Sequence, residues 1–264
     1  MSMLTKNEFL RKVVNGDSLK NYDLSEISLY NEKLTSLDLR GLYLSRATLN
    51  GADLTGANLS GADLSEAKLV GAKLENADLN KCKLQMADLG RADLSRADLS
   101  NADLRRASLS SARAMRTNLS KTDLSEANIN RAVLQAATLR NANMHKCYLE
   151  DANLKNADLW GVDLNDANLS NADCSGADFS GADLSRARLS HANLRGAKFK
   201  GAILKGTSLN DADLSEAKMA GVDMTTARLR RTKLREEDLA GVIYSSEQLK
   251  EMIILTSYKE KKER

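Results

Sequence analysis

The 264-residue chain contains no proline, and only 4% of its residues are aromatic. Average proteins contain about 5% proline, and ordinary cores take much of their bulk from Phe, Tyr and Trp. A chain without proline can donate a backbone hydrogen bond at every residue. Its core must be built from aliphatic side chains, since 42% of the residues are hydrophobic. The composition indicates a structure in which almost every backbone amide pairs with a neighbour.

Net charge, cysteine and long apolar runs are also scarce. The 39 basic and 36 acidic residues leave a charge of only +3, which favours neither nucleic-acid binding nor acidic mimicry. The cysteines are odd in number, lack metal-ligand spacing and are expected to be reduced core thiols: Cys82, Cys147 and Cys174. No run approaches the roughly 18 apolar residues of a membrane helix, and the first residues lack a signal-peptide core. We expect a cytoplasmic protein without a membrane segment, metal or cofactor.

A hydrophobic residue recurs at every fifth position from Leu19 to Leu239. These residues, mostly leucine, are termed the central positions. Two residues before most of them stands another apolar or small residue, usually alanine, and this position is termed the small position. From Ala47 to Thr232 no small position holds a side chain larger than valine. The pattern indicates two inward side chains per repeat, one of them under a strict size limit.

A period of five fits neither a helix nor a flat strand. On a helix the central positions would drift around every face, and in a flat strand they would alternate sides. Both conflicts disappear if the chain turns a corner once per repeat, so that four repeats close a square coil of about 20 residues. The sequence therefore predicts an all-β solenoid of about 11 coils, roughly 54 Å long at about 4.8 Å per layer.

The remaining three residues of each repeat are typical of turns. Ala52-Asp53-Leu54-Thr55-Gly56 shows the pattern, with Asp or Asn before the central position and Ser, Thr or Gly after it. This repeat resembles that of the pentapeptide-repeat family throughout residues 19–239. The resemblance implies a right-handed quadrilateral β-helix, and the hand follows from the resemblance alone.

Each end of the solenoid is expected to carry a short capping helix, because an open end exposes apolar surface and unpaired strand edges. Thr5 with Glu8 and Ser245 with Gln248 have the spacing of capping boxes, and Gly16 is a helix stop. The predicted organisation is an N-terminal capping helix in 1–17, the β-helix in 18–241, and a capping helix with a charged tail, Lys259–Arg264, in 242–264.

The C-terminal helix is predicted to continue through residue 255 with an apolar face. That helix either only closes the last coil, leaving a monomer, or also forms an end-to-end homodimer, an arrangement that the family resemblance keeps open. The candidate dimer contacts are Leu249, Met252, Ile253 and Ile254.

Ala114 is the smallest residue at any central position of the shaft. Replacing a core Leu by Ala typically costs about 2–5 kcal/mol. We therefore expect a local distortion near residues 112–118, with Met115 turning inward to fill the space.

No catalytic or metal-binding constellation emerges, so the chain is predicted not to be an enzyme. The interleaved arginines and aspartates of residues 88–116 are interpreted as a solvated surface. Trp160, the sole tryptophan, is outward, and Arg140 lies one coil earlier, within reach of a cation–π contact. With Tyr148 and Lys155 they form the candidate binding patch, because exposed Trp, Tyr and Arg are enriched at binding hot spots.

Two functions follow from these observations. The first is a non-enzymatic scaffold that mediates protein–protein interaction with an unidentified protein partner, since solenoids present extended binding surfaces. The alternative, implied by the family resemblance, is a DNA-mimicking protein that binds and protects gyrase. The balanced charge argues against this alternative, and also against direct binding of nucleic acid.

Overall fold

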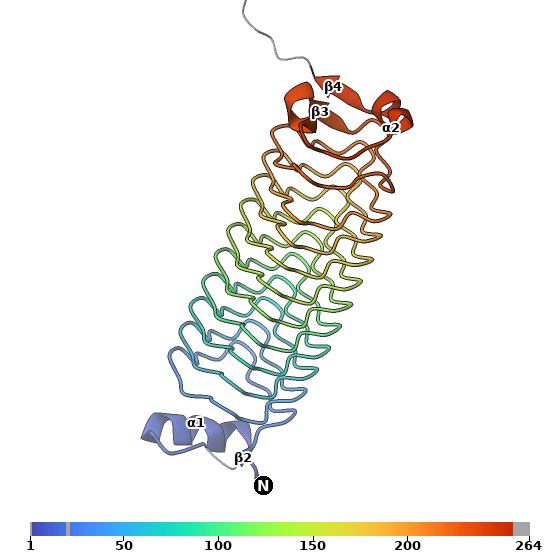
Figure 1. Cartoon of the computed structure of the whole chain (residues 1–264). Coiled ribbons are helices and arrows are strands. Elements are labelled where there is room, and N and C mark those ends of the chain that lie inside the picture. Colours follow the sequence, from blue (N-terminus) through green and yellow to red (C-terminus); the bar gives the residue numbers. More distant parts are fainter. Residues whose placement is uncertain (1, 20–21, 256–264) are drawn as a thin grey trace, which may run out of the picture.

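The computed structural model describes residues 2–19 and 22–255, and Figure 1 shows a long solenoid of stacked coils. Parallel bridges join residues twenty apart, as in Asp23 to Tyr43 and Tyr43 to Asp63. Successive bridges along the chain are five residues apart, so each coil contains four of them. This spacing confirms the predicted twenty-residue coil with one side per repeat.

Nearly every repeat turns its corner in the same way. The amide of Ala47 donates to the carbonyl of Leu44 at 3.0 Å, which closes a tight turn over the two intervening residues. The second of these, Arg46, has a φ of 57°, a left-handed conformation that costs a non-glycine residue roughly 1–2 kcal/mol. Its amide donates to the carbonyl of Ser65 in the next coil at 2.8 Å. The interlayer hydrogen bond thus offsets the strain, and the two residues of such a turn are termed a corner.

The Asp or Asn before each central position stabilises the corner that follows. Asn58 Oδ1 accepts a hydrogen bond from the amide of Ser60 at 3.0 Å, and Asp213 Oδ1 accepts one from the amide of Ser215 at 3.0 Å. Because these amides lie in the turn, a short acceptor side chain two residues earlier satisfies them. This contact explains the Asp and Asn preference of the sequence.

The core is a single column of inward side chains. Leu54 and Ala52 are fully buried, as are nearly all central and small positions. Phe179 and Phe199, at central positions of successive coils, stack with ring centroids 5.3 Å apart. Apart from these two rings and Phe9, the column consists mostly of Leu and Ala side chains.

Buried threonines and cysteines at small positions share a common hydrogen bond, except Thr122, whose hydroxyl donates to the carbonyl of Leu119. Thr117 Oγ1 donates to the carbonyl of Leu94 at 2.7 Å, and the Cys147 thiol donates to that of Leu124, also at 2.7 Å. Thr207, Thr232 and Cys82 make the same contact to the residue 23 positions earlier. Each buried polar group is thereby satisfied inside the core.

The expected distortion at Ala114 is absent from the hydrogen-bond ladder. Arg113 bridges Val133, and the amide of Ala114 donates to the carbonyl of Val133 at 2.8 Å. Met115 is half-buried at its corner, not inserted in the core. The prediction was wrong because the interlayer hydrogen bonds fix the backbone whatever the size of the central side chain.

The ladder is interrupted near the C-terminal end. Within the described chain, no backbone hydrogen bond joins residues 200–206 to residues 220–226, and the amide of Gly206 donates instead to Thr226 Oγ1 at 3.2 Å. Thr226 is β-branched and lacks the positive φ found at the equivalent corners. The two coils next to this altered corner therefore lack backbone hydrogen bonds to each other along one side.

The N-terminal elements lie against the first coil. Strand β1 (Ser2–Met3) pairs in parallel with β2 (Tyr22–Asp23). Between them, α1 (Lys6–Asn15) lies across the end of the solenoid (Figure 1). Its capping box of Thr5 and Glu8 is present, as is its end at Gly16, with a φ of 72°. Phe9 is fully buried in the core, so the helix covers apolar surface of the first coil.

At the C-terminal end the predicted helix is shorter than expected. The elements are β3 (Lys233–Arg235), the 3-10 helix η1 (Glu236–Leu239), α2 (Ser246–Glu251) and β4 (Ile253–Leu255). The capping box of Ser245 and Gln248 is confirmed. Residues after 251, however, return to the solenoid as β4, which pairs in parallel with β3. The charged tail, Lys259–Arg264, lies outside the described residues.

Candidate binding surfaces

Trp160 lies at a corner of the coil and is 46% exposed. Arg140 occupies the same corner one coil earlier, but its Nε donates to Asp158 Oδ2 at 2.5 Å, and this hydrogen bond raises the pKa of Arg140. Among the described residues, the cation–π contact found is elsewhere, between Lys12 Nζ and the Tyr22 ring at 4.9 Å. The expected contact of Arg140 with Trp160 is therefore replaced by an ion pair.

The four candidate patch residues do not form one surface. Arg140 and Trp160 are neighbours on one corner, whereas Lys155 is exposed on the preceding corner. Tyr148 is 53% exposed and lies two sides before Trp160, between Asn128 and Asn168 of the adjacent coils. The structure thus brings together only the tryptophan and the arginine.

The candidate dimer residues divide between α2 and β4. Leu249 of α2 and Ile253 of β4 are 39% and 38% exposed, whereas Met252 between them is buried at 8%. Ile254 is half-buried and packs against the core. The predicted helical face of Leu249, Met252 and Ile253 is not formed, because Ile253, like Ile254, belongs to the strand β4 and not to the helix.

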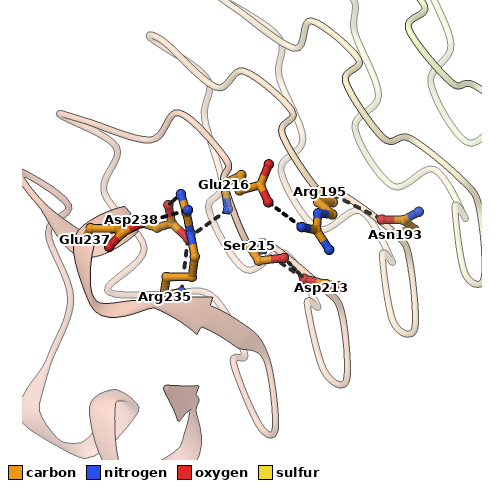
Figure 2. A network of polar contacts seen from close by, with 8 residues as sticks. All are labelled: Asn193, Arg195, Asp213, Ser215, Glu216, Arg235, Glu237 and Asp238. Atoms are coloured by element: carbon orange, nitrogen blue, oxygen red, sulfur yellow. Dashed lines mark hydrogen bonds and ion pairs between the residues drawn. The ribbon is translucent and has the colours of Figure 1, made fainter. Parts of the chain in front are cut away.

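A buried carboxylate closes the C-terminal end of one side (Figure 2). Asp238, in η1, has a side chain only 4% exposed and pairs with Arg235 through a 2.6 Å contact. Asp238 Oδ2 also accepts hydrogen bonds from the backbone amides of Glu216 at 2.8 Å and Arg235 at 3.0 Å. Burial would raise the pKa of Asp238, but the hydrogen bonds from Arg235 and the Glu216 amide outweigh it and lower that pKa.

Gln248 closes a neighbouring corner in a related way. Its side-chain Nε2 donates to the carbonyls of Met224 at 2.6 Å and Ala227 at 2.8 Å. Its Oε1 accepts from the amide of Ser245 at 2.8 Å, which completes the capping box of α2. The ends of the last coils are thus satisfied by side chains where a further coil would have supplied backbone groups.

The sides of the solenoid carry shallow grooves along its corners. One of about 530 Å³, termed the arginine groove, is lined by Glu75, Asp93, Ser95, Arg96, Arg113, Met115, Arg116, Gln135, Ala136 and Asn156. Arg96 pairs with Glu75 at 3.2 Å and Arg113 with Asp93 at 3.5 Å. Sequence reasoning assigned these arginines to a solvated surface, because linear spacing does not reveal which of them find carboxylate partners.

The described residues also bear on metal binding, thiol reactivity and membrane insertion. Among the residues that the structure describes, no group of three or more His, Cys, Asp or Glu side chains is placed to hold a metal ion. Burial raises the pKa of the Cys82 thiol to about 12. No helix in residues 2–19 or 22–255 combines the length and the apolar character needed to span a bilayer.

A solenoid of parallel coils with a Leu/Ala core defines the class of β-helical repeat proteins. The family model for pentapeptide repeats matches the chain in overlapping segments from residue 23 to 206 and again over 207–243. The chain therefore belongs to the pentapeptide-repeat family, and its solved relatives give the fold as a right-handed β-helix.

Several solved structures are similar to the chain. HetL, a pentapeptide repeat protein involved in heterocyst differentiation regulation in the cyanobacterium Nostoc, is 29% identical over 87% of this chain and 96% of its own, with a TM-score of 0.57. QnrB1, a plasmid-mediated fluoroquinolone resistance protein, is 18% identical over 69% of this chain and 91% of its own, with a TM-score of 0.49. A pentapeptide repeat protein of the Arabidopsis thaliana thylakoid lumen is 30% identical over 36% of this chain and 63% of its own, with a TM-score of 0.28. No curated protein sequence matches the chain significantly.

Proposed function

We propose that the chain is a non-enzymatic scaffold that binds a partner protein along the side of a rod of about eleven coils formed by residues 18–241. The observation that carries this proposal is the regular outward array of side chains on a rigid backbone, in which each layer is hydrogen-bonded to the next. Binding to such a preorganised surface requires little ordering of the scaffold itself. A regulatory role of this kind is compatible with that of HetL.

The corner that carries Trp160 is the proposed centre of contact. The indole is exposed, and the ion pair with Asp158 holds the neighbouring Arg140 beside the corner. A rigid, amphipathic aromatic side chain provides a large contact area at a low entropic cost. We therefore expect the tryptophan to contribute more to affinity than its neighbours.

Capture of partners from the native lysate, followed by mass spectrometry, tests the proposal. Trp160→Ala combined with Arg140→Ala should abolish capture without changing the melting temperature. Tyr30→Ala is the matched control, because Tyr30 is an exposed aromatic residue at another corner. Equal capture by the wild type and the double variant would remove Trp160 from the contact, and an empty capture by the wild type would contradict the scaffold.

The gyrase-protecting alternative requires a continuous acidic surface. On the side of the solenoid that carries Asp23, Asp63 and Asp103, however, carboxylates pair with cations. Asp63 pairs with Lys83 at 3.6 Å and Asp103 with Arg105 at 2.6 Å. At its adjoining corner Glu126 pairs with Arg106 at 2.9 Å. The likeness to QnrB1 concerns the fold alone. Relief of quinolone inhibition of purified gyrase would reverse this preference.

An end-to-end homodimer is the oligomeric state that we propose for the C-terminal end. Ile243, Leu249 and Ile253 are exposed there. Sedimentation of the wild type as a dimer and of Leu249→Asp as a monomer is the expected result. A wild-type protein that stays monomeric even at about 100 times the protein concentration used for capture would contradict the homodimer.

A further inference from the structure

The arginine groove differs from the other grooves of the solenoid in the pairing of its charges. In a comparable groove lined by Gln85, Met86, Arg105, Arg106, Ser125 and Glu126, both arginines are ion-paired, with Asp103 and with Glu126. In a third, Arg131 pairs with Asp151. In the arginine groove, by contrast, Arg116 forms no ion pair with any carboxylate of the described chain. The three arginines and two carboxylates of its lining leave one positive charge in excess.

The corner one coil after Arg116 carries a short side chain. Arg96 occupies the equivalent corner position one coil earlier, and Ala136 occupies it one coil later. Ala136 has a φ of 55°, a conformation that at most other corners of the solenoid is taken by glycine or by a polar residue. The truncated side chain at this corner leaves the groove unfilled next to the free cation.

A buried hydroxyl lies in the same groove. Ser95 is 8% exposed, and its Oγ is the buried side-chain oxygen in the described residues that has no hydrogen-bond partner. At comparable repeats the hydroxyl is satisfied locally, as where Ser125 Oγ donates to Asp123 Oδ1 at 2.8 Å. A buried donor without an acceptor is unfavourable, and a bound acceptor would relieve it. The lining of one cavity thus contains the unpartnered hydroxyl of Ser95 and the exposed guanidinium of Arg116, which has no carboxylate partner among the described residues.

We propose that the arginine groove binds an extended peptide segment of the partner that carries one carboxylate or phosphate group. Guanidinium groups recognise both anions through paired N–H donors, and the Ser95 hydroxyl supplies a further donor. Glu75, Ser95, Met115 and Gln135 follow one another at twenty-residue spacing, so the groove crosses four coils. Four layers span roughly 14 Å, the length of about four extended residues.

This inference rests on the proposed scaffold function and specifies the chemistry of its partner. The anion lies against Arg116 and Ser95, while Met115, half-buried in the groove, offers an apolar contact for the neighbouring peptide residue. The groove is on a different corner from Trp160, so a partner that uses both sites would contact two corners of the rod.

Fluorescence-anisotropy titrations with labelled, end-blocked seven-residue peptides test the proposal. The peptides consist of glycine and alanine with a central phosphoserine, aspartate or serine, and inorganic phosphate is titrated in parallel. We expect the phosphoserine or aspartate peptide to bind and the serine peptide to bind at least about tenfold more weakly, as loss of a charge-assisted contact implies. Equal binding of the serine peptide, or no binding of any peptide below about 1 mM, would overturn the proposal.

Three variants locate the site. Arg116→Gln should weaken binding about tenfold or more, and Ser95→Ala about threefold or more. Arg91→Gln is the matched control, because Arg91 is exposed, has a φ of 56° at another corner, and makes no ion pair within the described chain. It should change affinity less than twofold. An equal loss in Arg91→Gln and Arg116→Gln would show only general attraction and would overturn the site.

Inorganic phosphate and the captured partner separate the remaining outcomes. If inorganic phosphate bound as tightly as the phosphoserine peptide, the groove would be a free-anion site and the peptide assignment would be wrong. If Arg116→Gln captured the partner in unchanged yield, the scaffold would stand and the groove would be excluded from its contact. Peptide binding without capture of any partner would contradict the scaffold instead.

Discussion

Asp238→Ala should destabilise the C-terminal coils without affecting the rest of the solenoid. The substitution removes the acceptor of two backbone amides, those of Glu216 and Arg235. Hydrogen bonds to a charged acceptor contribute about 1.5–3 kcal/mol each. The Arg235 side chain is 32% exposed and becomes hydrated when Asp238 is removed. Loss of its contacts therefore adds little to the free-energy cost of the substitution. We expect a loss of about 3 kcal/mol in the free energy of local opening.

Hydrogen exchange measured by mass spectrometry gives the local opening free energy directly. In a solenoid each coil contacts only its neighbours, so the lost protection should be confined to the last coils. Glu237→Ala is the control, because Glu237 pairs with the same arginine at 2.7 Å but is 56% exposed; its effect should be small. Unchanged protection around Glu216 in Asp238→Ala, or an equal loss in Glu237→Ala, would refute the assigned role of the buried carboxylate.

The same carboxylate makes the end sensitive to acid. Because the folded-state pKa of Asp238 lies below its ordinary value, its contribution is complete above the unfolded pKa of about 3.9. That contribution is lost as the pH falls through the lower, folded value. Protection of the last coils should therefore decrease in acid in the wild type, and Asp238→Asn should remove this part of the pH dependence.

Three further outcomes are expected. Thr117→Val should destabilise the protein by about 1 kcal/mol in urea titrations, since it removes the hydroxyl donor from the buried carbonyl of Leu94, which keeps only the amide of Ala97 at 2.9 Å. Thr117→Ser should restore most of the loss, and equal stability of all three proteins would contradict the prediction. The amides of Gly201 and Leu204 should exchange faster than those of Gly181 and Leu184 in the preceding coil, because they lack the backbone hydrogen bonds to the next coil; uniform exchange would contradict this. Cys82, with its pKa raised to about 12 by burial, should resist thiol reagents at pH 8 until the protein unfolds, and rapid native labelling would show that the core opens there.

The sequence predicts the solenoid well because its strongest pattern, the period of five, is compatible with only one chain geometry. A side chain at every fifth position can remain inward only if each repeat turns a corner, and size-limited residues at the small positions reinforce the same geometry. The capping boxes of Thr5 and Ser245 are equally local signals, since each needs only two side chains three residues apart.

The C-terminal error has an identifiable cause. Leu249, Met252 and Ile253 fit a helical face, but Ile254 also continues the period of five from Leu239, and Met252 falls at the corresponding small position. The structure follows this second pattern, since β4 pairs with β3 twenty residues away. The ladder supplies backbone partners that an isolated helical turn lacks, so tertiary pairing overrides the local preference.

The surface could not be predicted to the same depth. Arg96, Arg113 and Arg116 have similar sequence surroundings, yet only the first two meet carboxylates in adjacent coils. Pairing depends on which rotamer reaches across a layer, and no repeat pattern specifies that choice. The orphan hydroxyl of Ser95 likewise appears only when its neighbours in three dimensions are known.

The twenty-residue spacing of the bridges also determines how the rod tolerates changes in length. Insertion or deletion of one five-residue repeat would keep every central side chain inward, yet it would rotate all later corners by a quarter-turn about the axis. An insertion between residues 116 and 160 would change the angle about the axis between Arg116 and Trp160, although each would keep its local structure. Only changes by multiples of twenty preserve the relative direction of two surfaces. A partner that spans several coils therefore constrains the angle about the axis between its contact surfaces, and not the stability of the rod.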